Sequence, residues 1–340
     1  MRSPVFIAVL LAFAGAHAEA PKLTYLAPDL TPAEVAELAK AVPNVKIVTG
    51  LDKKSALAHA AEANGVDARL LTPELIARAP KLTWAQSPSA GVEWVVNMPE
   101  LQKADRIILT NARGVHGPVI AEHAMAMLLS LTRNLPFYRE AQRAGRWRDG
   151  DPPRPSLAVQ DKTMFVVGIG GIGSEIAKRA HAFGMRVIAT RRTDAPVPDY
   201  VARAGKPQDL LAFLAEADVV AIAVPLTKET EHLFDDKAFA AMKTGAFLLN
   251  VSRGKIVDTD ALLRALRSGK LAGAGLDVTD PEPLPANHPL WKEPNVVLTP
   301  HSSSDADLTR ERRSALLKEN LRRFGAGDAL LNVVDKKAGY

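Results

Sequence analysis

Three side chains that could bind an anion or move a proton follow apolar, strand-like segments late in the sequence. Arg253 follows AFLLNV, Glu282 lies in the proline-rich stretch after GAGLDV, and His301 follows NVVLTP. A histidine can exchange a proton near neutral pH, and a carboxylate beside it can hold its tautomer and raise its pKa. An arginine can bind a substrate carboxylate or polarise a carbonyl group. We therefore predict that these three side chains form one catalytic group.

A glycine motif indicates a second site, one for a dinucleotide. The stretch GIGGIG follows the apolar segment MFVVG and opens a helical segment. In this pattern the first glycine permits a tight turn, the second lets a pyrophosphate approach the backbone, and the third brings helix against strand. Amides at the helix N-terminus then face the phosphates. The predicted phosphate-binding residues are Gly168, Gly170, Gly171, Ile172 and Gly173.

The next strand-like segment, RVIAT, ends in Arg191 and Arg192. A site for NAD normally has Asp or Glu here, which binds the ribose 2′-hydroxyl. Two guanidinium groups suit a 2′-phosphate, which a carboxylate would repel. The alternative is that both arginines are solvated surface residues after a strand. We predict NADP(H) as the preferred cofactor, with NAD(H) as the second option.

The elements that must position these residues alternate between strand and helix along almost the whole chain. The strand-like segments are 23–27, 45–50, 66–71, 82–86, 106–110, 164–168, 186–190, 218–224, 246–251, 273–278 and 295–300. Apolar strands joined by helices predict parallel sheets covered on both faces. Open sheets of this kind bind ligands at the carboxyl ends of their strands, where the three catalytic candidates lie. A long helical pattern at 119–143 and a proline-rich loop at 149–156 precede the glycine motif.

Composition narrows the class of protein further. The chain has 340 residues, 47% of them hydrophobic and 24% charged, with a formal net charge of +5. This is ordinary for a soluble globular protein and leaves room for two domains. The basic residues are scattered among acids, so we predict no nucleic-acid partner. Without cysteine the chain has no disulfide, thiolate metal site or cysteine nucleophile, and we predict no metal site.

The N-terminus has the layout of a secretory signal peptide. Its start is positively charged, an apolar run at 5–14 is too short to span a bilayer, and Ala16–Ala18 supplies an A-x-A cleavage pattern. We predict a signal peptide at 1–18, a mature terminus at Glu19 or Pro21, and export to the periplasm or medium. A mis-set start codon is the alternative and would leave the protein in the cytoplasm. No later segment is apolar enough to span a membrane.

Residues 80–325 resemble the D-isomer-specific 2-hydroxyacid dehydrogenase family. The resemblance is densest in ADVVAIAVPLTKETEHLF, MKTGAFLLNVSRGKIVDTDALLRALRSGKLAGAGLDV, EPLPANHPLW and PNVVLTPH. It implies that Arg253 binds the substrate, that His301 is the general acid/base, and that Glu282 is its partner. The double arginine resembles the NADPH-preferring glyoxylate/hydroxypyruvate reductase branch. The implied reaction is reduction of a small 2-oxo acid of that type to the D-2-hydroxy acid by NAD(P)H.

The resemblance also implies the remaining contacts. The loop SPSAGVEW would hold the substrate carboxylate through backbone amides around Ala90 and Gly91, beside Arg253 and His301. Asp277 would meet the nicotinamide carboxamide. The other residues expected beside the cofactor are Pro225, Thr230, Val251 and Ser303. The chain departs from many members at Ser302–Ser304, where they carry Gly or Ala.

The family fold is α/β, with two Rossmann-like domains of doubly wound parallel sheets. Residues 21–117 and 305–335 would form a discontinuous substrate domain, and 118–304 the cofactor domain inserted into it, with hinges near 117 and 303. The resemblance implies a homodimer around the long helix, which would bring Trp147 to a neighbour's site. Two other functions stay open: an exported cofactor-sensing binding protein without turnover, and a formate- or phosphite-oxidising relative.

Overall fold

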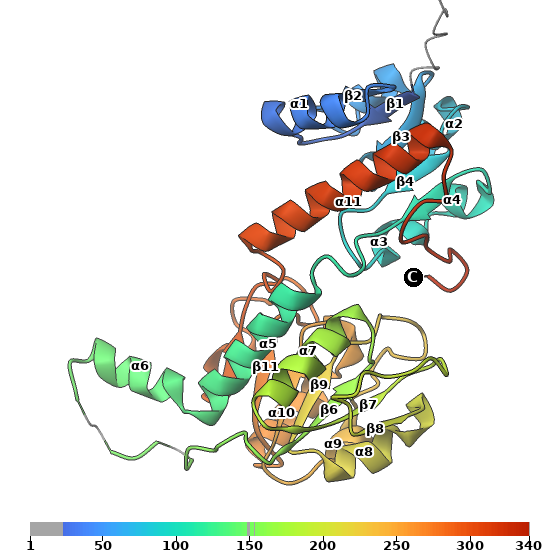
Figure 1. Ribbon diagram of the computed structural model, residues 1–340. Helices are drawn as coiled ribbons and strands as arrows, with labels where there is room; N and C mark the ends of the chain where they lie inside the picture. The colour runs from blue at the N-terminus through green and yellow to red at the C-terminus, as the bar shows by residue number, and fades with distance from the viewer. Residues whose placement is uncertain (1–22, 148–149, 153, 340) are drawn as a thin grey trace, which may run out of the picture.

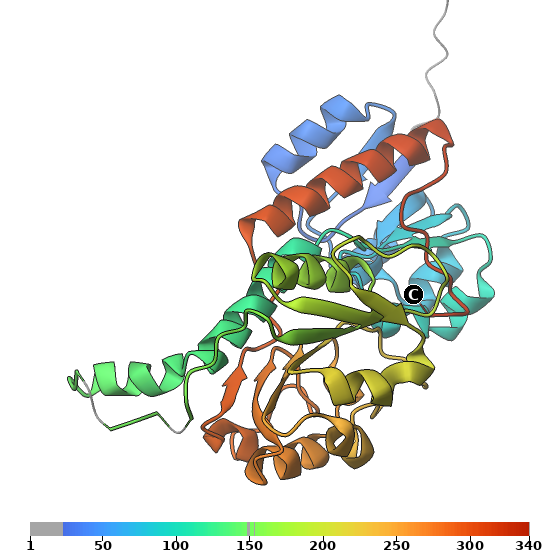
Figure 2. The same ribbon diagram turned by 60° about the horizontal axis from the view of Figure 1, so that its bottom comes forward.

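The protein folds into two lobes that are joined where the chain passes between them twice (Figures 1 and 2). The computed structural model describes residues 23–147, 150–152 and 154–339. The predicted signal peptide at 1–18 lies outside these described residues. Among the helices in the described ranges, none combines the length and the apolar character needed to cross a bilayer.

The first lobe contains a parallel five-stranded sheet in the order β2-β1-β3-β4-β5. Its strands are β1 (Leu23–Leu26), β2 (Val45–Val48), β3 (Ala63–Asp67), β4 (Trp84–Gln86) and β5 (Ile108–Thr110). Its helices are α1 (Pro32–Ala41), α2 (Pro73–Arg78), α3 (Glu93–Val96), α4 (Pro99–Lys103) and α11 (Asp307–Ala326). Side chains alternate along β1, so Tyr25 packs toward α1 and α11 while Leu26 packs toward α2, α3 and α4.

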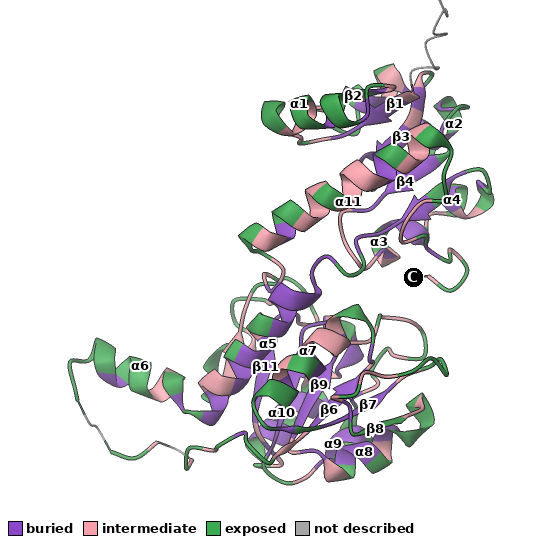
Figure 3. Cartoon of the chain, viewed as in Figure 1, coloured by how far each residue is buried: buried purple, intermediate pink, exposed green. Residues whose placement is uncertain are grey.

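The second lobe contains a parallel seven-stranded sheet in the order β12-β11-β10-β9-β6-β7-β8. Its strands are β6 (Thr163–Val167), β7 (Arg186–Thr190), β8 (Arg203–Gly205), β9 (Val219–Ile222), β10 (Ala246–Asn250), β11 (Leu271–Leu276) and β12 (Val296–Leu298). Its helices are α5 (Gly117–Thr132), α6 (Leu135–Arg143), α7 (Gly171–Ala182), α8 (Leu210–Glu216), α9 (Asp236–Ala241) and α10 (Thr259–Arg267). Helices α5 and α7 cover one face and α8, α9 and α10 the other, so the central strands β6, β9, β10 and β11 are buried on both sides, whereas the edge strand β8 is exposed (Figure 3).

The last long helix returns to the first lobe. On α11, Phe324 stacks on Trp84, which stacks on Tyr25, with ring centroids 5.1 Å apart in both pairs. The buried amide of Asn320 donates to Gln86 Oε1 at 2.9 Å, and its Oδ1 accepts from the Leu331 amide at 2.8 Å. The N-terminal sheet and this C-terminal helix therefore share one core, which confirms the predicted fold class with a discontinuous first domain.

Two predicted elements are wrong in detail. The single helix expected at 119–143 is divided into α5 and α6 by Asn134, which has a left-handed φ of 55°. Pro136 follows in the first turn of α6 and has no N–H for the carbonyl four residues earlier, so one helix cannot continue through it. The strand expected at 66–71 ends at Asp67, whose side chain accepts the Arg69 amide and opens a 3-10 turn. The 3-10 helices are Ser55–His59, Ala68–Leu70, Pro207–Asp209, Gly254–Ile256 and Pro289–Lys292.

Candidate active site

The structure brings His301 and Glu282 into direct contact. Nδ1 of His301 lies 2.7 Å from Oε1 of Glu282, and both side chains are 43% exposed. Glu282 lies in the loop after β11 and His301 in the loop after β12, and these two strands are neighbours in the sheet. Because Glu282 binds Nδ1, the other ring nitrogen, Nε2, is left for a ligand. No residue of the described chain hydrogen-bonds to Nε2.

A buried carboxylate, that of Asp277, anchors the loop that carries His301. It accepts hydrogen bonds from Thr299 Oγ1 at 2.6 Å and from the amides of Ser302 and Ser303 at 2.9 and 3.1 Å. Burial raises the pKa of Asp277, but these hydrogen bonds outweigh it, so the pKa lies below its usual value. The His301 amide also donates to the Asp277 carbonyl at 2.7 Å. The Asp277 side chain is wholly enclosed, so its contact with the nicotinamide carboxamide stays a prediction.

Arg253 is held by the end of β10. Asn250 accepts the Ser252 amide at 3.1 Å and donates to the Arg253 carbonyl at 2.9 Å, which fixes the turn after the strand. The Arg253 guanidinium donates through Nη1 to the Ser252 carbonyl at 2.7 Å. Through Nε it forms an ion pair with Glu93, a residue of α3 in the first lobe. The side chain of Arg253 therefore spans the two lobes.

The predicted carboxylate-binding loop lies against the guanidinium of Arg253. A Cβ atom built on Gly91 would come within 1.9 Å of Arg253 Nη2, so any other residue here would displace the guanidinium. The Ala90 carbonyl accepts from Asn111 Nδ2 at 2.9 Å, which positions the loop. Within the described residues, the amides of Ala90 and Gly91 donate to no acceptor. Two free N–H groups beside a guanidinium form a suitable site for a carboxylate.

The glycine motif has the geometry that its sequence predicts. Gly168 follows β6 with a φ of 95°, and a Cβ there would lie 2.6 Å from the Val224 side chain. A Cβ on Gly173 would lie 2.0 Å from the Gly168 carbonyl oxygen, so this glycine allows helix and strand to touch. Gly170 faces open space, and no side chain caps α7, which begins at Gly171. Free amides before an open surface fit a pyrophosphate, and Ile172 is half-buried behind them.

The other predicted cofactor residues lie around this edge of the sheet. Thr230 Oγ1 donates to the Pro225 carbonyl at 2.7 Å and closes a turn after β9, the strand next to β6. Val251 is buried in the core on the α5 and α7 side. Ser303 is buried, with its amide on Asp277. Pro225 and Thr230 are therefore accessible at the edge of the sheet, whereas Val251 and Ser303 are buried beneath it.

The double arginine follows β7. Arg191 Nη1 donates to the carbonyls of Ala195 and Pro196 at 2.5 and 2.6 Å, and its Nε is buried without a partner among the described residues. Arg192 is exposed. Lys206, just after β8, adds a third cation: its ammonium binds Asp194 and the Arg192 carbonyl. The hydrogen bond from Lys206 lowers the pKa of Asp194, so the local acid is already paired.

Sequence reasoning missed two residues of this site. Glu93 stands in the quoted loop SPSAGVEW, but its partner comes from the other lobe. Lys206 follows a short, exposed edge strand that has no apolar pattern to reveal it. Within the described chain, no cluster of three or more His, Asp or Glu side chains could hold a metal ion.

Comparisons with known proteins agree with this geometry. The family model described as "D-isomer specific 2-hydroxyacid dehydrogenase, NAD binding domain" matches residues 125–303. The glyoxylate reductase of Thermococcus litoralis is 38% identical over 268 residues, which cover 77% of this chain and 80% of that protein.

Two solved structures extend the match over almost the whole chain. A D-isomer-specific 2-hydroxyacid dehydrogenase family protein from Aeromonas salmonicida has a TM-score of 0.80 and 34% identity, over 93% of this chain and 99% of that one. An NADPH-dependent glyoxylate/hydroxypyruvate reductase from Sinorhizobium meliloti was solved in complex with NADP and sulfate. It has a TM-score of 0.77 and 28% identity, over 94% of this chain and 100% of that one. The predicted family is confirmed, and the chain belongs to the D-isomer-specific 2-hydroxyacid dehydrogenases.

Proposed function

We propose that this NAD(P)-dependent dehydrogenase reduces a small 2-oxo acid of the glyoxylate or hydroxypyruvate type to the D-2-hydroxy acid. The observation that carries the proposal is that free amides lie beside a guanidinium, and that this guanidinium and a histidine–carboxylate pair follow strands that end at the same edge of the sheet. The free amides of Ala90 and Gly91 lie beside Arg253, and the His301–Glu282 pair lies at the same edge of the sheet. The names of the relatives from Thermococcus litoralis and Sinorhizobium meliloti support this substrate class.

Each of these residues has a role in the proposed reaction. The amides of Ala90 and Gly91 and the guanidinium of Arg253 hold the substrate carboxylate. Protonated His301 donates from Nε2 to the keto oxygen, while Glu282 stabilises the imidazolium through Nδ1. Arg253 also stabilises the negative charge that develops on that oxygen. The bound nicotinamide cofactor supplies the hydride that reduces the keto carbon.

We propose NADP(H) as the preferred cofactor. Arg191, Arg192 and Lys206 gather positive charge after β7 and β8, where an NAD site would carry a free acid. Asp194, the nearby acid, is neutralised by Lys206. The S. meliloti relative is NADPH-dependent by name, which agrees with this preference.

A panel of substrates tests the proposed function. Glyoxylate, hydroxypyruvate and pyruvate are offered with NADPH or NADH, and formate and phosphite with NADP⁺ or NAD⁺. We expect oxidation of NADPH with at least one 2-oxo acid and no reduction of cofactor by formate or phosphite. Cofactor binding without turnover of any 2-oxo acid would support the binding-protein alternative instead. Turnover of formate or phosphite would instead identify the protein as a formate- or phosphite-oxidising relative.

Export is proposed from the N-terminal sequence. A positive start, a short apolar run and the A-x-A pattern at Ala16–Ala18 support a signal peptide at 1–18. Mass spectrometry of the protein from its native host should give a mature N-terminus at Glu19 or Pro21. An intact N-terminus on the soluble protein would place the enzyme in the cytoplasm.

We also propose a homodimer formed through α6. This helix projects from the second lobe (Figures 1 and 2), and its Leu135 and Tyr138 side chains are exposed. Trp147, a few residues beyond α6, is fully exposed. In a dimer built on this arm, Trp147 would reach the site of the second copy.

A further inference from the structure

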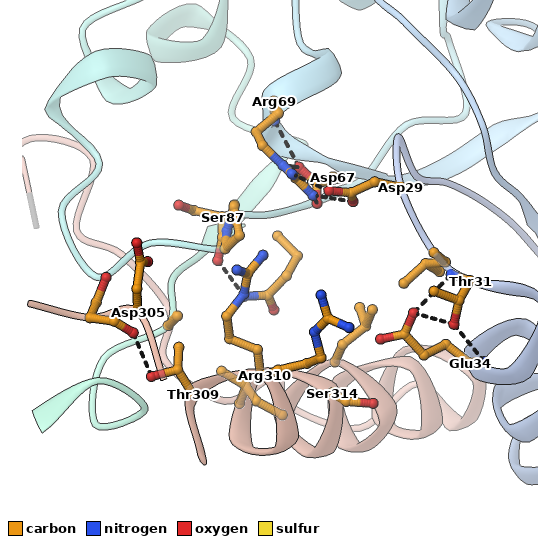
Figure 4. A pocket seen from close by; sticks show the side chains of 18 of the residues that line it. Asp29, Thr31, Glu34, Asp67, Arg69, Ser87, Asp305, Thr309, Arg310 and Ser314 are labelled. Atoms are coloured by element: carbon orange, nitrogen blue, oxygen red, sulfur yellow. Dashed lines mark hydrogen bonds and ion pairs between the residues drawn. The ribbon is translucent and has the colours of Figure 1, made fainter. Parts of the chain in front are cut away.

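A cavity of about 370 Å³ lies in the first lobe, apart from the candidate active site (Figure 4). It opens between α1 and α11, and Arg253, Glu282 and His301 are absent from its described lining. It shares with the active site only the start of the carboxylate-binding loop, through Ser87 and Pro88. Its volume is within the usual range for small-molecule sites, roughly 300–1,000 Å³.

The topology of the sheet explains why a cavity forms here. The chain runs from β1 through α1 to β2 on one side and later to β3 on the other, so the strand order reverses between β1 and β3. Open parallel sheets bind ligands at such a point, outside the carboxyl ends of the strands. Residues 29–31 follow β1, residue 69 follows β3, and all of them line the cavity. The glycine motif occupies the equivalent point of the second sheet, between β6 and β9.

Two arginines of α11 line this cavity without a partner in the part of the chain that the structure describes. Arg310 and Arg313 are one helical turn apart and both contribute to the lining (Figure 4 labels Arg310). Neither forms a hydrogen bond or an ion pair with any residue of the described chain. Farther along the same helix, Arg322 and Arg323 are both paired with Glu319. Two unpaired like charges side by side repel each other, and a bound anion would remove that repulsion.

Three of the acids in the lining are already bound. Asp29 and Asp67 both accept from Arg69, at 2.7 and 2.9 Å. Glu34 accepts from the amide and the hydroxyl of Thr31, at 2.8 and 2.7 Å. Arg69 compensates one of the two charges of Asp29 and Asp67, and the hydrogen bonds from Thr31 hold Glu34 on α1, as Figure 4 shows. The remaining acid, Asp305, is exposed.

The field of the two free guanidinium groups reaches into the cavity. After the hydrogen bonds from Arg69, the charge of Arg313 contributes to the lowered pKa of Asp29. After the hydrogen bonds from Thr31, Arg310 contributes to the lowered pKa of Glu34. The two guanidinium groups on α11 therefore act electrostatically on the carboxylates at the opposite side of the cavity, next to α1.

We propose that this cavity is a second ligand site, which binds a small oxyanion, a carboxylate or a phosphate, between Arg310 and Arg313. Guanidinium groups bind both anions through paired, charge-assisted hydrogen bonds. The site is separate from the proposed reaction, and its ligand need be neither substrate nor cofactor.

Titration calorimetry tests the proposal without substrate or cofactor. The probes are inorganic phosphate and malonate, each added at an ionic strength matched with NaCl. We expect saturable binding of at least one probe, and the two titrations distinguish a phosphate site from a carboxylate site. In Arg310→Gln/Arg313→Gln the Kd should rise by about 10-fold or more for each lost charge pair. Arg312→Gln, on the same helix but outside the cavity lining, is the matched control and should bind normally.

Arg253→Gln separates this cavity from the active site and should also bind normally. The proposal is overturned if the wild type shows no saturable binding, or if the double variant binds as tightly as wild type. It is equally overturned if Arg253→Gln alone abolishes binding. The single variants Arg310→Gln and Arg313→Gln, checked by circular dichroism, replace the double variant if that one fails to fold. Because the readout is binding, absence of 2-oxo acid turnover would leave this test unaffected.

Discussion

His301 depends on Glu282 for the choice of the nitrogen that faces the substrate. Since Glu282 binds Nδ1, the proposed mechanism assigns proton transfer to the keto oxygen to Nε2. His301→Ala should lower kcat by about 10²-fold or more, the usual contribution of general acid catalysis. The Kd for NADPH should barely change, because the predicted phosphate-binding residues, 168–173, lie in a different loop, the one after β6. Steady-state rates and a cofactor titration check both expectations, and near-normal turnover would remove His301 from the mechanism.

We expect Glu93 to affect substrate binding through Arg253, its ion-pair partner. Its carboxylate holds Nε of the guanidinium and leaves Nη2 against the loop at Gly91. Glu93→Ala should raise KM for the 2-oxo acid by about 10-fold, with a smaller effect on kcat, because substrate binding depends on this orientation. Glu93→Gln keeps an acceptor and should recover most of the loss. Glu100→Ala, on the neighbouring α4, is the control, and a KM for Glu93→Ala equal to that of wild type would exclude a positioning role.

Arg191 determines which cofactor binds best if it contacts the 2′-phosphate. Each charge-assisted contact contributes roughly 1.5–3 kcal/mol, or about 10-fold or more in affinity. Arg191→Asp should therefore raise the KM for NADPH steeply while the KM for NADH holds or improves. Higher salt should weaken NADPH binding more than NADH binding. If the ratio of kcat/KM for the two cofactors is the same in wild type and variant, Arg191 is a surface residue.

At the scale of elements, the segment that leads from β5 into α5 contains a buried histidine. Burial, with a contribution from Arg313, lowers the pKa of His116 to about 4 from 6.5. Between these values the unfolded chain binds more protons than the folded one, so stability is complete above pH 6.5 and falls toward pH 4. The difference between the two pKa values corresponds to at most about 3 kcal/mol in the free energy of unfolding.

Urea denaturation at pH 7.5 and pH 5 measures this contribution. In His116→Gln the loss of stability between the two pH values should be smaller than in wild type. Carboxylates with lowered pKa values, such as Asp277, lose their contribution mainly below about pH 5 and do so equally in both proteins. The same pH dependence in both proteins would show that His116 does not carry the effect.

The elements also show how far sequence reasoning extends. Apolar strands separated by helical patterns predict both sheets, and polar residues at strand ends predict Arg253 and His301 at one edge. Pro136 marks the break at Asn134 in the sequence, but the apolar residues on both sides of it favour a single helix. The end of β3 is hidden because Leu70 and Leu71, buried in the turn, extend the apolar run.

Contacts between distant segments could not be predicted in the same way. The ion pair of Glu93 with Arg253 depends on how the two lobes meet. The enclosure of Asp277 depends on a loop that folds back over it. Neither leaves a periodic pattern in the sequence, because each arises from tertiary packing alone.

For the whole molecule, the exposed apolar face of α6 predicts self-association. Leu135 and Tyr138 are 52% and 46% exposed on a helix that projects from the second lobe. Light scattering should give a dimer for wild type and a monomer for Leu135→Glu/Tyr138→Glu, because buried charges destabilise an apolar interface. Arg143→Gln, on the same helix, should remain dimeric. A monomeric wild type would exclude the dimer. A double variant that remains dimeric would place the interface outside this face of α6.

The return of α11 to the first lobe also reverses the order in which the lobes can be completed during protein synthesis. The second lobe has all its strands once residue 298 has been made, whereas the stack of Tyr25, Trp84 and Phe324 needs a residue made later. Domains usually fold as units while the ribosome extends the chain. We therefore expect the first lobe, although its strands are made first, to finish folding after the second lobe. Until α11 emerges, its Trp84 face remains uncovered while the nucleotide-binding lobe is already folded.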